Sequence, residues 1–318
     1  MPLRRVIGID AGGTKLLGGV VDDALVVHHR VHRTWRGARR QETLDIMTEA
    51  VEEIRAAAPD VVAVGFGIPA LVQRNTGVSR WSTHLPLEEV PFRDLMSERL
   101  GLPVVVDNDS NAALVAEHRA GAAKGARHAA LIALGTGIGG GLLLDGRIYR
   151  GADGLGAELG HMVIDLDGPD CQGACPGRGC LEVLASGTAI GVAGREAGRG
   201  SPESELGRRA AAGREITGAL VTELAHRGDV AARGALEGVG RRLGAGITSL
   251  VNALNPEVVV IGGGAVAAGE LLLGPARSVV AERALPPSRE RVRIVPAHFG
   301  DESGMLGAAL LALEGLGA

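Results

Sequence analysis

The stretch Val104-Val105-Val106-Asp107-Asn108-Asp109-Ser110-Asn111-Ala112-Ala113 decides the fold that we expect for this chain. Its apolar, β-branched run passes directly into acids and amides, and an alanine-rich segment with helical spacing follows. The pattern predicts a strand that runs into the N-terminus of a helix, with Asp109 or Ser110 at the cap. Polar side chains at the carboxyl end of a buried strand face the crevice where α/β sheets bind ligands. Because Asn and Asp are also ordinary turn and cap residues, this stretch alone leaves both interpretations open.

Length and composition indicate the class of protein. The 318 residues exceed the usual size of a single core and predict two domains, and the 46% hydrophobic content suffices for a large core. The net charge of −4 comes without a basic stripe, which argues against nucleic acid as a partner. No signal peptide and no apolar run of membrane-spanning length is visible, so we expect a cytoplasmic protein without membrane contact.

A glycine turn joins two predicted strands near the start of the chain. Residues 5–10 and 16–21 predict buried strands, and Ala11-Gly12-Gly13-Thr14-Lys15 predicts the turn between them. The GxxxxGK[ST] spacing of a Walker loop is absent. A glycine hairpin can still present backbone N–H groups to a phosphate, and Asp10 at the strand end can hold Mg²⁺ through water. An ordinary tight hairpin is the alternative interpretation.

A second glycine turn repeats this arrangement later in the chain. The predicted strand Ala129–Leu134 leads into Gly135-Thr136-Gly137-Ile138-Gly139-Gly140-Gly141, which matches GxGxxG. A dinucleotide-binding fingerprint needs a helix next, whereas Leu142–Tyr149 predicts two strands around an Asp-Gly turn. The two glycine hairpins therefore predict a duplicated fold that binds a nucleotide between its lobes, with backbone amides and helix dipoles neutralising the phosphates.

All three cysteines fall within ten residues of a segment with little periodicity. The segment 151–182 contains, in order, Glu158, His161, Cys171, Cys175, Cys180 and Glu182. His161 and the three cysteines provide the four soft ligands of a closed tetrahedral zinc site, which we favour over free thiols. A zinc ion on one nitrogen of His161 leaves the other as a defined hydrogen-bond donor for a ligand. Glu158 and Glu182 flank the cluster, and solvated loop acids are the alternative interpretation for both.

The rest of the chain alternates between helical and strand patterns. Helices are predicted over Gln41–Ala58, Gly187–Gly198, Glu215–His226, Asp229–Leu254, Glu270–Arg283 and Ser303–Leu313, and strands over Val61–Phe66, Val258–Ile261 and Arg291–Val295. Residues 71–91 predict a long irregular region, and the polar segment 201–213 predicts a surface connection. Gly262-Gly263-Gly264 either lets a flat ring or a ribose lie against the backbone or permits close strand–helix packing.

Together these segments resemble the ROK family (repressors, open reading frames and kinases), and within it the zinc-containing bacterial glucokinases. The resemblance rests on Asp10–Lys15, Asp107–Asn111, Leu134–Gly141, Gly156–His161, the cysteine cluster that ends Gly179-Cys180-Leu181-Glu182, and Asn255–Gly264. It implies the actin-like, hexokinase-like ATPase fold, in which two ribonuclease H-like α/β lobes close over a cleft. We expect residues 1–113 with 304–318 to form the small lobe, and 114–303 to form the large lobe with the zinc-binding loop.

The resemblance also implies an ATP-dependent sugar kinase in which Asp109 is the general base for the attacking hydroxyl group. The implied sugar contacts are Gly67, Asn108, Asp109, Glu158, His161 and Glu182. The implied contacts to ATP and its Mg²⁺ are Asp10, Gly12, Gly13, Thr14, Lys15, Gly135, Thr136, Gly137 and Gly263. The implied zinc ligands, structural rather than catalytic, are His161, Cys171, Cys175 and Cys180. The resemblance also implies a homodimer or a homotetramer.

Several positions depart from the family pattern and keep the acceptor open. Ala70 and Gln73 stand where the family has Gly and Asp, His84 stands where it has Asn, and the first two cysteines are four residues apart instead of two. Glucose is the first candidate, and mannose, an amino sugar such as N-acetylmannosamine or a C7-cyclitol is the alternative. A sugar-sensing repressor is less expected, because the motif that follows the family's DNA-binding domain begins here at Asp10. A catalytically inactive binding module is not favoured, because Asp109 is present.

Overall fold

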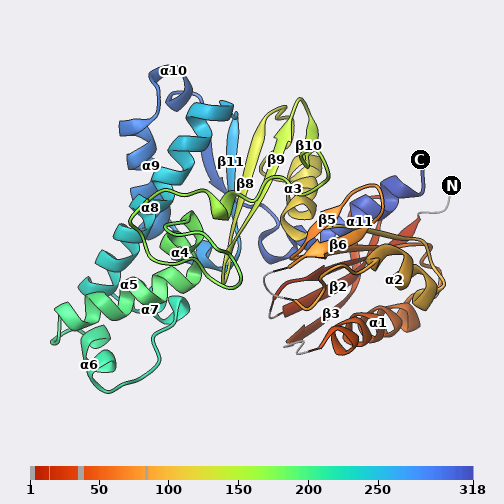
Figure 1. Ribbon diagram of the computed structural model, residues 1–318, viewed down its shortest axis with the longest axis horizontal. Helices are drawn as coiled ribbons and strands as arrows, with labels where there is room; N and C mark the ends of the chain where they lie inside the picture. Colours follow the sequence, from red (N-terminus) through yellow and green to blue (C-terminus); the bar gives the residue numbers. More distant parts are fainter. Residues whose placement is uncertain (1–3, 14, 35–38, 83–84, 318) are drawn as a thin grey trace. The chain divides into compact units, whose positions relative to one another are not determined.

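The computed structural model describes residues 4–13, 15–34, 39–82 and 85–317 (Figure 1). The chain groups into two compact units, the first made of residues 1–125, 141–157 and 297–318 and the second of residues 126–140 and 158–296. The first unit thus includes 114–125, 141–157 and 297–303, which the sequence analysis assigned to the large lobe. The predicted lobe boundaries differ from these units and stay a prediction.

The first sheet combines a three-stranded antiparallel meander with two further strands that run parallel to its first strand. In spatial order its strands are β3 (Val27–Thr34), β2 (Lys15–Asp22), β1 (Arg5–Ala11), β4 (Val64–Ile68) and β7 (Val104–Asn108). β1 pairs with β2 in antiparallel and with β4 in parallel orientation, and β4 pairs with β7 in parallel orientation. The register places Asp10 opposite Gly67 and Gly67 opposite Asp107, so three parallel strands end in one row.

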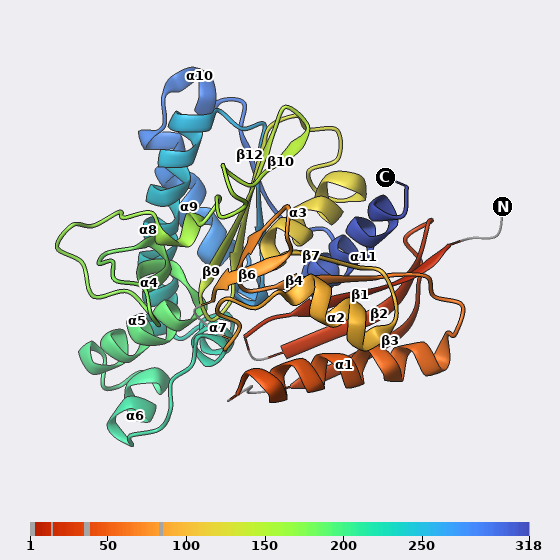
Figure 2. The same cartoon turned by 45° about the vertical axis from the view of Figure 1, so that its right-hand side comes forward.

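Helices cover both faces of this sheet because its central strands are apolar on both sides. Ile7 and Ile9 of β1 belong to one core with α1 (Arg40–Ala57) and α2 (Phe92–Leu100), whereas Val6 belongs to the opposite core. That second core is formed with α3 (Asp109–Ala120) and α11 (Ser303–Gly315). Figure 2 shows α1 along one face of the sheet. The alternation of side chains along β1 therefore directs Asp10 toward the face that α11 covers.

Two local predictions for the first unit were wrong. The N-cap of α3 is Asn108, whose side chain accepts hydrogen bonds from the next helical N–H groups, and not Asp109 or Ser110. The region 71–91 is not irregular throughout, because β5 (Leu71–Gln73) and β6 (Val78–Trp81) form a two-stranded hairpin in it. A pair of strands this short gives too few alternating positions for a periodicity to be visible in the sequence.

The second sheet repeats the strand order of the first. In spatial order its strands are β10 (Arg147–Tyr149), β9 (Ile138–Leu144), β8 (Ala129–Leu134), β11 (Val258–Gly262) and β12 (Arg293–Pro296). In each sheet the order along the chain is third, second, first, fourth and fifth strand, and a glycine turn links the first strand to the second. This repetition confirms the α/β class and the duplication that the two glycine hairpins predict. A strand follows Gly135–Gly137, as expected for a hairpin and not for a dinucleotide-binding helix.

Helices surround the long helix α8 in the second unit. The described helices of the second unit are η1 (Leu159–His161), α4 (Leu181–Ala185), α5 (Gly187–Gly200), α6 (Glu205–Ala211), α7 (Gly218–His226), α8 (Val230–Leu254), η2 (Gly264–Ala268), α9 (Glu270–Arg283) and α10 (Pro286–Arg289). α8 lies within one residue of the predicted helix Asp229–Leu254; Asp229 is its N-cap, and Asn255 after its end adopts the left-handed conformation. The predicted surface connection 201–213 instead contains α6, which Ser204 caps. Among the described helices, none combines the length and the apolar character needed to cross a membrane.

Candidate functional site

The carboxyl edge of the first sheet gathers predicted site residues from three strands. Asp10 and Gly67 each lie one residue before the end of their strands, β1 and β4, and Asp107 and Asn108 end β7. Because these strands are parallel and in register, their polar ends lie at one edge of the sheet. In α/β proteins this is the edge where ligands bind. The structure therefore brings Asp10, Gly67, Asn108 and the following Asp109 together within one unit.

Hydrogen bonds at the N-terminus of α3 fix the backbone that carries Asp109. Asn108 Oδ1 accepts the N–H groups of Ser110 at 3.0 Å and Asn111 at 3.2 Å. Asp109 Oδ1 accepts the N–H group of Ser110 at 2.7 Å and its hydroxyl group at 3.2 Å. A helix N-terminus favours negative charge. The position thus suits a carboxylate that has to stay oriented and accept a proton.

Gly67 gives the start of α3 room above β4. A Cβ atom on Gly67 would lie 3.3 Å from the Cα atom of Asp109 and 3.4 Å from the Cβ atom of Ala112. The distance to the Asp109 Cα atom is tighter than usual for side-chain packing, and the distance to Ala112 is at the lower limit of ordinary contact. A glycine at this position therefore permits the close approach of Asp109 to the sheet edge.

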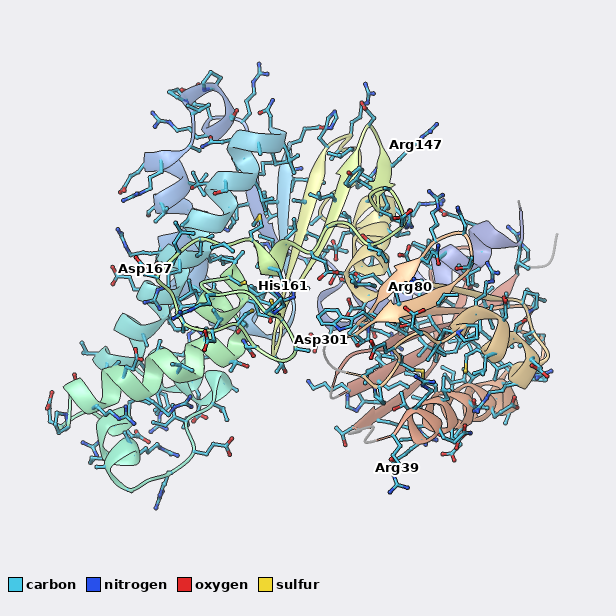
Figure 3. All side chains as sticks on the ribbon, viewed as in Figure 1. Arg39, Arg80, Arg147, His161, Asp167 and Asp301 are labelled. Carbon is cyan, nitrogen blue, oxygen red and sulfur yellow. The ribbon has the colours of Figure 1, made fainter. Side chains whose placement is uncertain are left out.

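Asp10 is a partly buried carboxyl group surrounded by negative charge. Burial first, and then the charges of Asp109 and Asp301, raise its pKa from 3.8 to about 8. Asp301 is labelled in Figure 3 and belongs to η3 (Gly300–Glu302), which precedes α11. A Cβ atom on Gly304 would lie 2.5 Å from the Asp10 carboxyl group, so this glycine leaves the space that Asp10 occupies. No hydrogen-bond partner of the Asp10 side chain is found within the described ranges, so a cation is the natural complement of this group.

The glycine turn after Asp10 joins β1 to β2. Gly12 and Gly13 lie between the strands and are partly exposed, and the Lys15 side chain at the start of β2 is exposed. Thr14, also predicted to contact ATP, lies outside the described residues. The hairpin predicted from the sequence is confirmed, whereas its phosphate contacts stay a prediction.

The second unit holds its own glycine turn against the start of α5. Gly135 donates its N–H group to Gly137 O at 2.9 Å and accepts the N–H group of Gly187 at 2.8 Å. The hydroxyl group of Thr188 donates to Thr136 O at 2.7 Å. Two backbone carbonyl groups of the turn, those of Gly135 and Thr136, are thereby bonded by the start of α5, and a helix N-terminus is a place where anions are favoured.

Gly263 lies beside this turn because β8 and β11 end together. Its φ of +80° is in the region that favours glycine, and a Cβ atom there would lie 2.5 Å from Leu134 O. Gly263 thus allows close packing against the end of the strand β8, whereas the Gly262–Gly264 run predicted strand–helix packing or a ring or ribose against the backbone. This packing also brings Gly263 next to the turn Gly135–Gly137, which follows Leu134. These predicted ATP contacts are therefore neighbours in the second unit.

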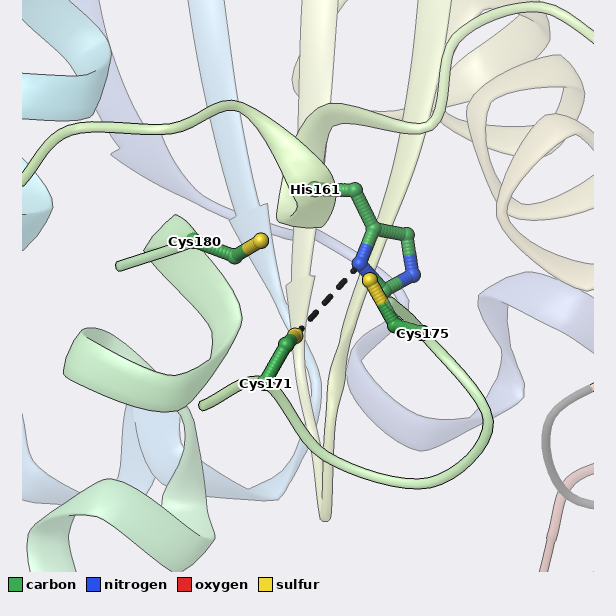
Figure 4. A group of neighbouring side chains, drawn as sticks. All are labelled: His161, Cys171, Cys175 and Cys180. Atoms are coloured by element: carbon green, nitrogen blue, oxygen red, sulfur yellow. Dashed lines mark hydrogen bonds between the residues drawn. The ribbon is translucent and has the colours of Figure 1, made fainter. Parts of the chain in front are cut away.

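Four metal-ligating side chains converge in the same unit. One ligand atom each of His161, Cys171, Cys175 and Cys180 lies within 4.8 Å of all the others (Figure 4). His161 Nδ1 is 3.7 Å from Cys171 Sγ. A tetrahedral zinc ion with Zn–S bonds of about 2.3 Å and a Zn–N bond of about 2.0 Å separates its ligand atoms by about 3.5–3.8 Å. Burial raises the pKa of the Cys171 and Cys180 thiols in the absence of a metal. The donor set and its spacing fit a closed zinc site.

Glu182 links this cluster to the strand after the glycine turn. Its side chain is buried, its Oε2 accepts the N–H group of Ile138 at 2.8 Å, and its Oε1 lies 3.9 Å from Cys171 Sγ. Glu158 is half-buried, and its backbone carbonyl accepts the N–H group of His161 at 3.1 Å. Glu182 is therefore buried beside the metal-ligating residues and is not a solvated loop acid, whereas the role of the Glu158 side chain stays a prediction.

Some side chains that shape these sites were not found by the sequence analysis. Arg150 binds Asp107, Asp301 and Gly304 adjoin Asp10, and Thr188 binds the glycine turn. Arg150 has no motif around it, and the partner of an arginine 43 positions away is not visible in a single sequence. Gly304 gives a weak signal, because glycine in the first turn of a helix is unfavourable unless a neighbour needs the space.

Comparison with known proteins places the whole chain in one group. The sequence profile of the ROK family matches residues 6–315. The glucokinase of Thermotoga maritima is 33% identical over 100% of both chains, and the glucokinase of Streptomyces coelicolor is 32% identical over 97% of both. The crystal structure of a ROK family glucokinase from Streptomyces griseus in complex with glucose and AMPPNP superposes with a TM-score of 0.89 at 32% identity, over 98% of this chain and 99% of that one. The predicted actin-like, hexokinase-like fold class is thereby confirmed.

Proposed function

This chain belongs to the ROK family, and we propose on that premise that it transfers the γ-phosphoryl group of ATP to a hydroxyl group of a sugar, with glucose as the first candidate acceptor. The observation that carries the proposal is the likeness over nearly the full length to a glucokinase whose structure holds glucose and an ATP analogue. The oriented Asp109 carboxylate at the sheet edge supports it independently.

Asp109 acts in this proposal as the general base. It takes the proton of the sugar hydroxyl group while the oxygen attacks the γ-phosphorus atom, and the bond from that phosphorus to the ADP oxygen breaks with its electron pair leaving on ADP. Asn108 and Gly67 contribute by position, since Asn108 caps α3 and Gly67 admits the start of that helix. Catalysis of this kind depends mainly on orientation and charge stabilisation.

Asp10 is proposed to face the Mg²⁺ ion that accompanies ATP. Its partly buried carboxyl group lies among other acids, which fits a site that a divalent cation completes. A bound cation supplies charge neutralisation for the phosphates. Gly12, Gly13, Thr14 and Lys15 follow Asp10 directly and are the proposed phosphate contacts of the first unit.

The second unit is proposed to supply the remaining contacts. Gly135, Thr136, Gly137 and Gly263 hold the nucleotide, and Glu158, His161 and Glu182 contact sugar hydroxyl groups. Zinc on His161 Nδ1 and the three cysteines would fix the imidazole, so that Nε2–H is a donor of defined orientation. The zinc site is structural in this proposal. Because thiol ligands persist in reducing compartments, we also propose a cytoplasmic location.

The acceptor itself depends on a loop that differs from the family pattern. Ala70 is buried, and its carbonyl oxygen accepts a hydrogen bond from Asn108 Nδ2 at 3.4 Å. Gln73 bonds through its Oε1 to the Thr76 hydroxyl group at 3.2 Å, while His84 lies outside the described residues. A change at Ala70 thus acts directly beside a proposed sugar contact. This contact is the reason to keep mannose, an amino sugar or a cyclitol as the alternative acceptor.

The proposal is tested by measuring ADP release with Mg-ATP across glucose, mannose, glucosamine, N-acetylglucosamine, N-acetylmannosamine, fructose and a cyclitol. Turnover on glucose, with a sugar phosphate identified by ³¹P NMR, is the expected result. Turnover on another acceptor alone makes Ala70 and Gln73 the first positions to exchange for the family's Gly and Asp. Absence of turnover on the whole panel, with sugar binding retained in calorimetry, contradicts the proposed kinase function.

A further inference from the structure

A largely buried ion pair involves Asp107, two residues before the proposed general base Asp109. Arg150 follows β10, and its Nε and Nη2 atoms both donate to Asp107 Oδ2, at 2.8 Å and 2.5 Å. The two side chains are only 12% and 10% exposed. The same guanidinium group donates through Nη1 to Ile148 O at 3.3 Å. Arg150 is thereby anchored to its own strand while it holds a residue 43 positions earlier.

The other oxygen of Asp107 continues the contact into the turn before α3. Asp107 Oδ1 accepts the N–H group of Asn108 at 2.8 Å and Nδ2 of Asn111 at 3.2 Å. Asn111 is 1% exposed, and its Oδ1 has no hydrogen-bond partner in the described part of the chain. The bond to Asp107 is therefore the side-chain contact that holds Asn111. Both oxygens of Asp107 are engaged, one with Arg150 and one with the turn.

This chain of contacts ends at Asp109. In the cap of α3, the Asn108 side chain accepts a hydrogen bond from the N–H group of Asn111, and Asp109 lies between these two residues in the chain. Loss of Arg150 would leave the Asp107 carboxylate buried without a counter-charge, and such a group turns toward water or draws water in. Either movement shifts the N–H group of Asn108 and the amide of Asn111. A displacement of about 1 Å at a reacting group lowers a rate by about 10²-fold.

We infer that Arg150 is a positioning residue for the phosphoryl transfer: through Asp107 it holds the turn that orients Asp109. The inference rests on the proposed kinase function and adds a residue outside the family motifs of the chain. It is distinct from a role in folding alone, because the contacts of the pair converge on Asn108 and Asn111, which lie on either side of the base in the first turn of α3.

The surroundings of Arg150 make this role testable by chemical rescue. Arg150 lines a cavity of about 310 Å³ together with Gln73, Arg74 and Asn75 of the β5–β6 turn and residues 148–154. The cavity is open to solvent, so truncation of Arg150 to alanine leaves a space that a free guanidinium ion can enter. Arg147 is a matched control, since it lies in β10 three residues before Arg150, is exposed, and points away from β10 in Figure 3.

The experiment compares kcat, the sugar KM and the melting temperature of the full-length parent, Arg150→Ala, Arg150→Lys and Arg147→Ala. We expect Arg150→Ala to lower kcat by about 10²-fold with a sugar KM within about threefold of the parent. Guanidinium or methylguanidinium at millimolar concentration should raise the kcat of Arg150→Ala about tenfold and should not raise the kcat of the other proteins. Arg147→Ala should keep the kcat of the parent with and without guanidinium.

Each outcome decides the inference. A folded Arg150→Ala variant with the kcat of the parent contradicts the inference. An Arg150→Ala variant with a lower melting temperature and a reduced kcat that guanidinium does not raise contradicts it as well. If Arg150→Ala does not fold, Arg150→Lys decides, with a lowered kcat in support and an unchanged kcat against. An inactive parent refutes the proposed function and this inference with it, whereas an active parent beside an equally active Arg150→Ala refutes the inference alone.

Discussion

Exchange of Asp10 for asparagine is expected to stabilise the chain while it removes the proposed Mg²⁺ contact. The carboxyl group has an ordinary pKa of 3.8, and burial with the charges of Asp109 and Asp301 raises it to about 8 in the folded chain. Each pKa unit corresponds to about 1.4 kcal/mol. Above pH 8 the ionised carboxylate therefore lowers the free energy of unfolding by up to about 6 kcal/mol relative to an uncharged side chain.

The sign of the pH dependence follows from proton binding. Between pH 3.8 and about 8 the folded chain keeps a proton on Asp10 that the unfolded chain has lost. The unfolding free energy of the parent thus falls as the pH rises through this window. Asparagine has no proton to lose, so the advantage of Asp10→Asn should grow by about 3–4 kcal/mol between pH 5 and pH 8.

The assay is urea unfolding of the parent and Asp10→Asn at pH 5, 6.5 and 8, without added Mg²⁺ and without a chelator that would strip a zinc site. Asp60→Asn is the control, since Asp60 has an exposed side chain paired with Arg5 at the surface. The control should follow the parent within about 0.5 kcal/mol at each pH. An Asp10→Asn variant whose advantage stays constant or shrinks toward pH 8 would refute the electrostatic account of this position.

Three further predictions concern separate features. Gly304→Ala should displace the Asp10 carboxyl group, since its Cβ atom would lie 2.5 Å away, and should lower kcat/KM for Mg-ATP by at least about tenfold, whereas Gly238→Ala, at an exposed and open position inside α8, should stabilise by about 0.5–1 kcal/mol; equal kinetics of both variants in coupled assays would argue against this. Glu117→Gln should cost about 3 kcal/mol in urea unfolding, because the buried carboxylate accepts four hydrogen bonds, three of them from backbone N–H groups; a cost below about 1 kcal/mol would show that these contacts rearrange freely. The purified parent should carry about one zinc ion per chain in elemental analysis, and Cys175→Ser should lose most of it and melt at a lower temperature; a metal-free parent with full activity would exclude the zinc proposal.

The sequence predicted the features that depend on short-range patterns. The two glycine hairpins, the strand Ala129–Leu134 and the helix Glu270–Arg283 are found where the residues indicate them. The four metal-ligating side chains also converge, since three cysteines within ten residues leave few other arrangements. In these cases the chemistry of neighbouring residues determines the local structure.

The remaining features depend on contacts between distant segments. Asn108 caps α3 instead of Asp109 or Ser110. Its side-chain oxygen Oδ1 reaches the N–H groups of Ser110 and Asn111 once β7 has set the direction of the chain. Arg150 meets Asp107 only after β10 and β7 are folded, and the raised pKa of Asp10 depends first on its burial and then on the charges of Asp109 and Asp301, which the fold brings near. A single sequence gives the residue types at such positions but not which of them will meet.

The central claim is that Asp109 is the base in phosphoryl transfer to a sugar. The most direct measurement is the single-turnover rate of the parent and of Asp109→Asn with saturating Mg-ATP and the acceptor that the panel selects, together with the sugar Kd from calorimetry. The account predicts a rate at least about 10³-fold lower in Asp109→Asn, with a Kd within about threefold of the parent, because the amide cannot accept the proton but keeps the shape of the turn. A variant that transfers phosphate within about tenfold of the parent rate would contradict the account.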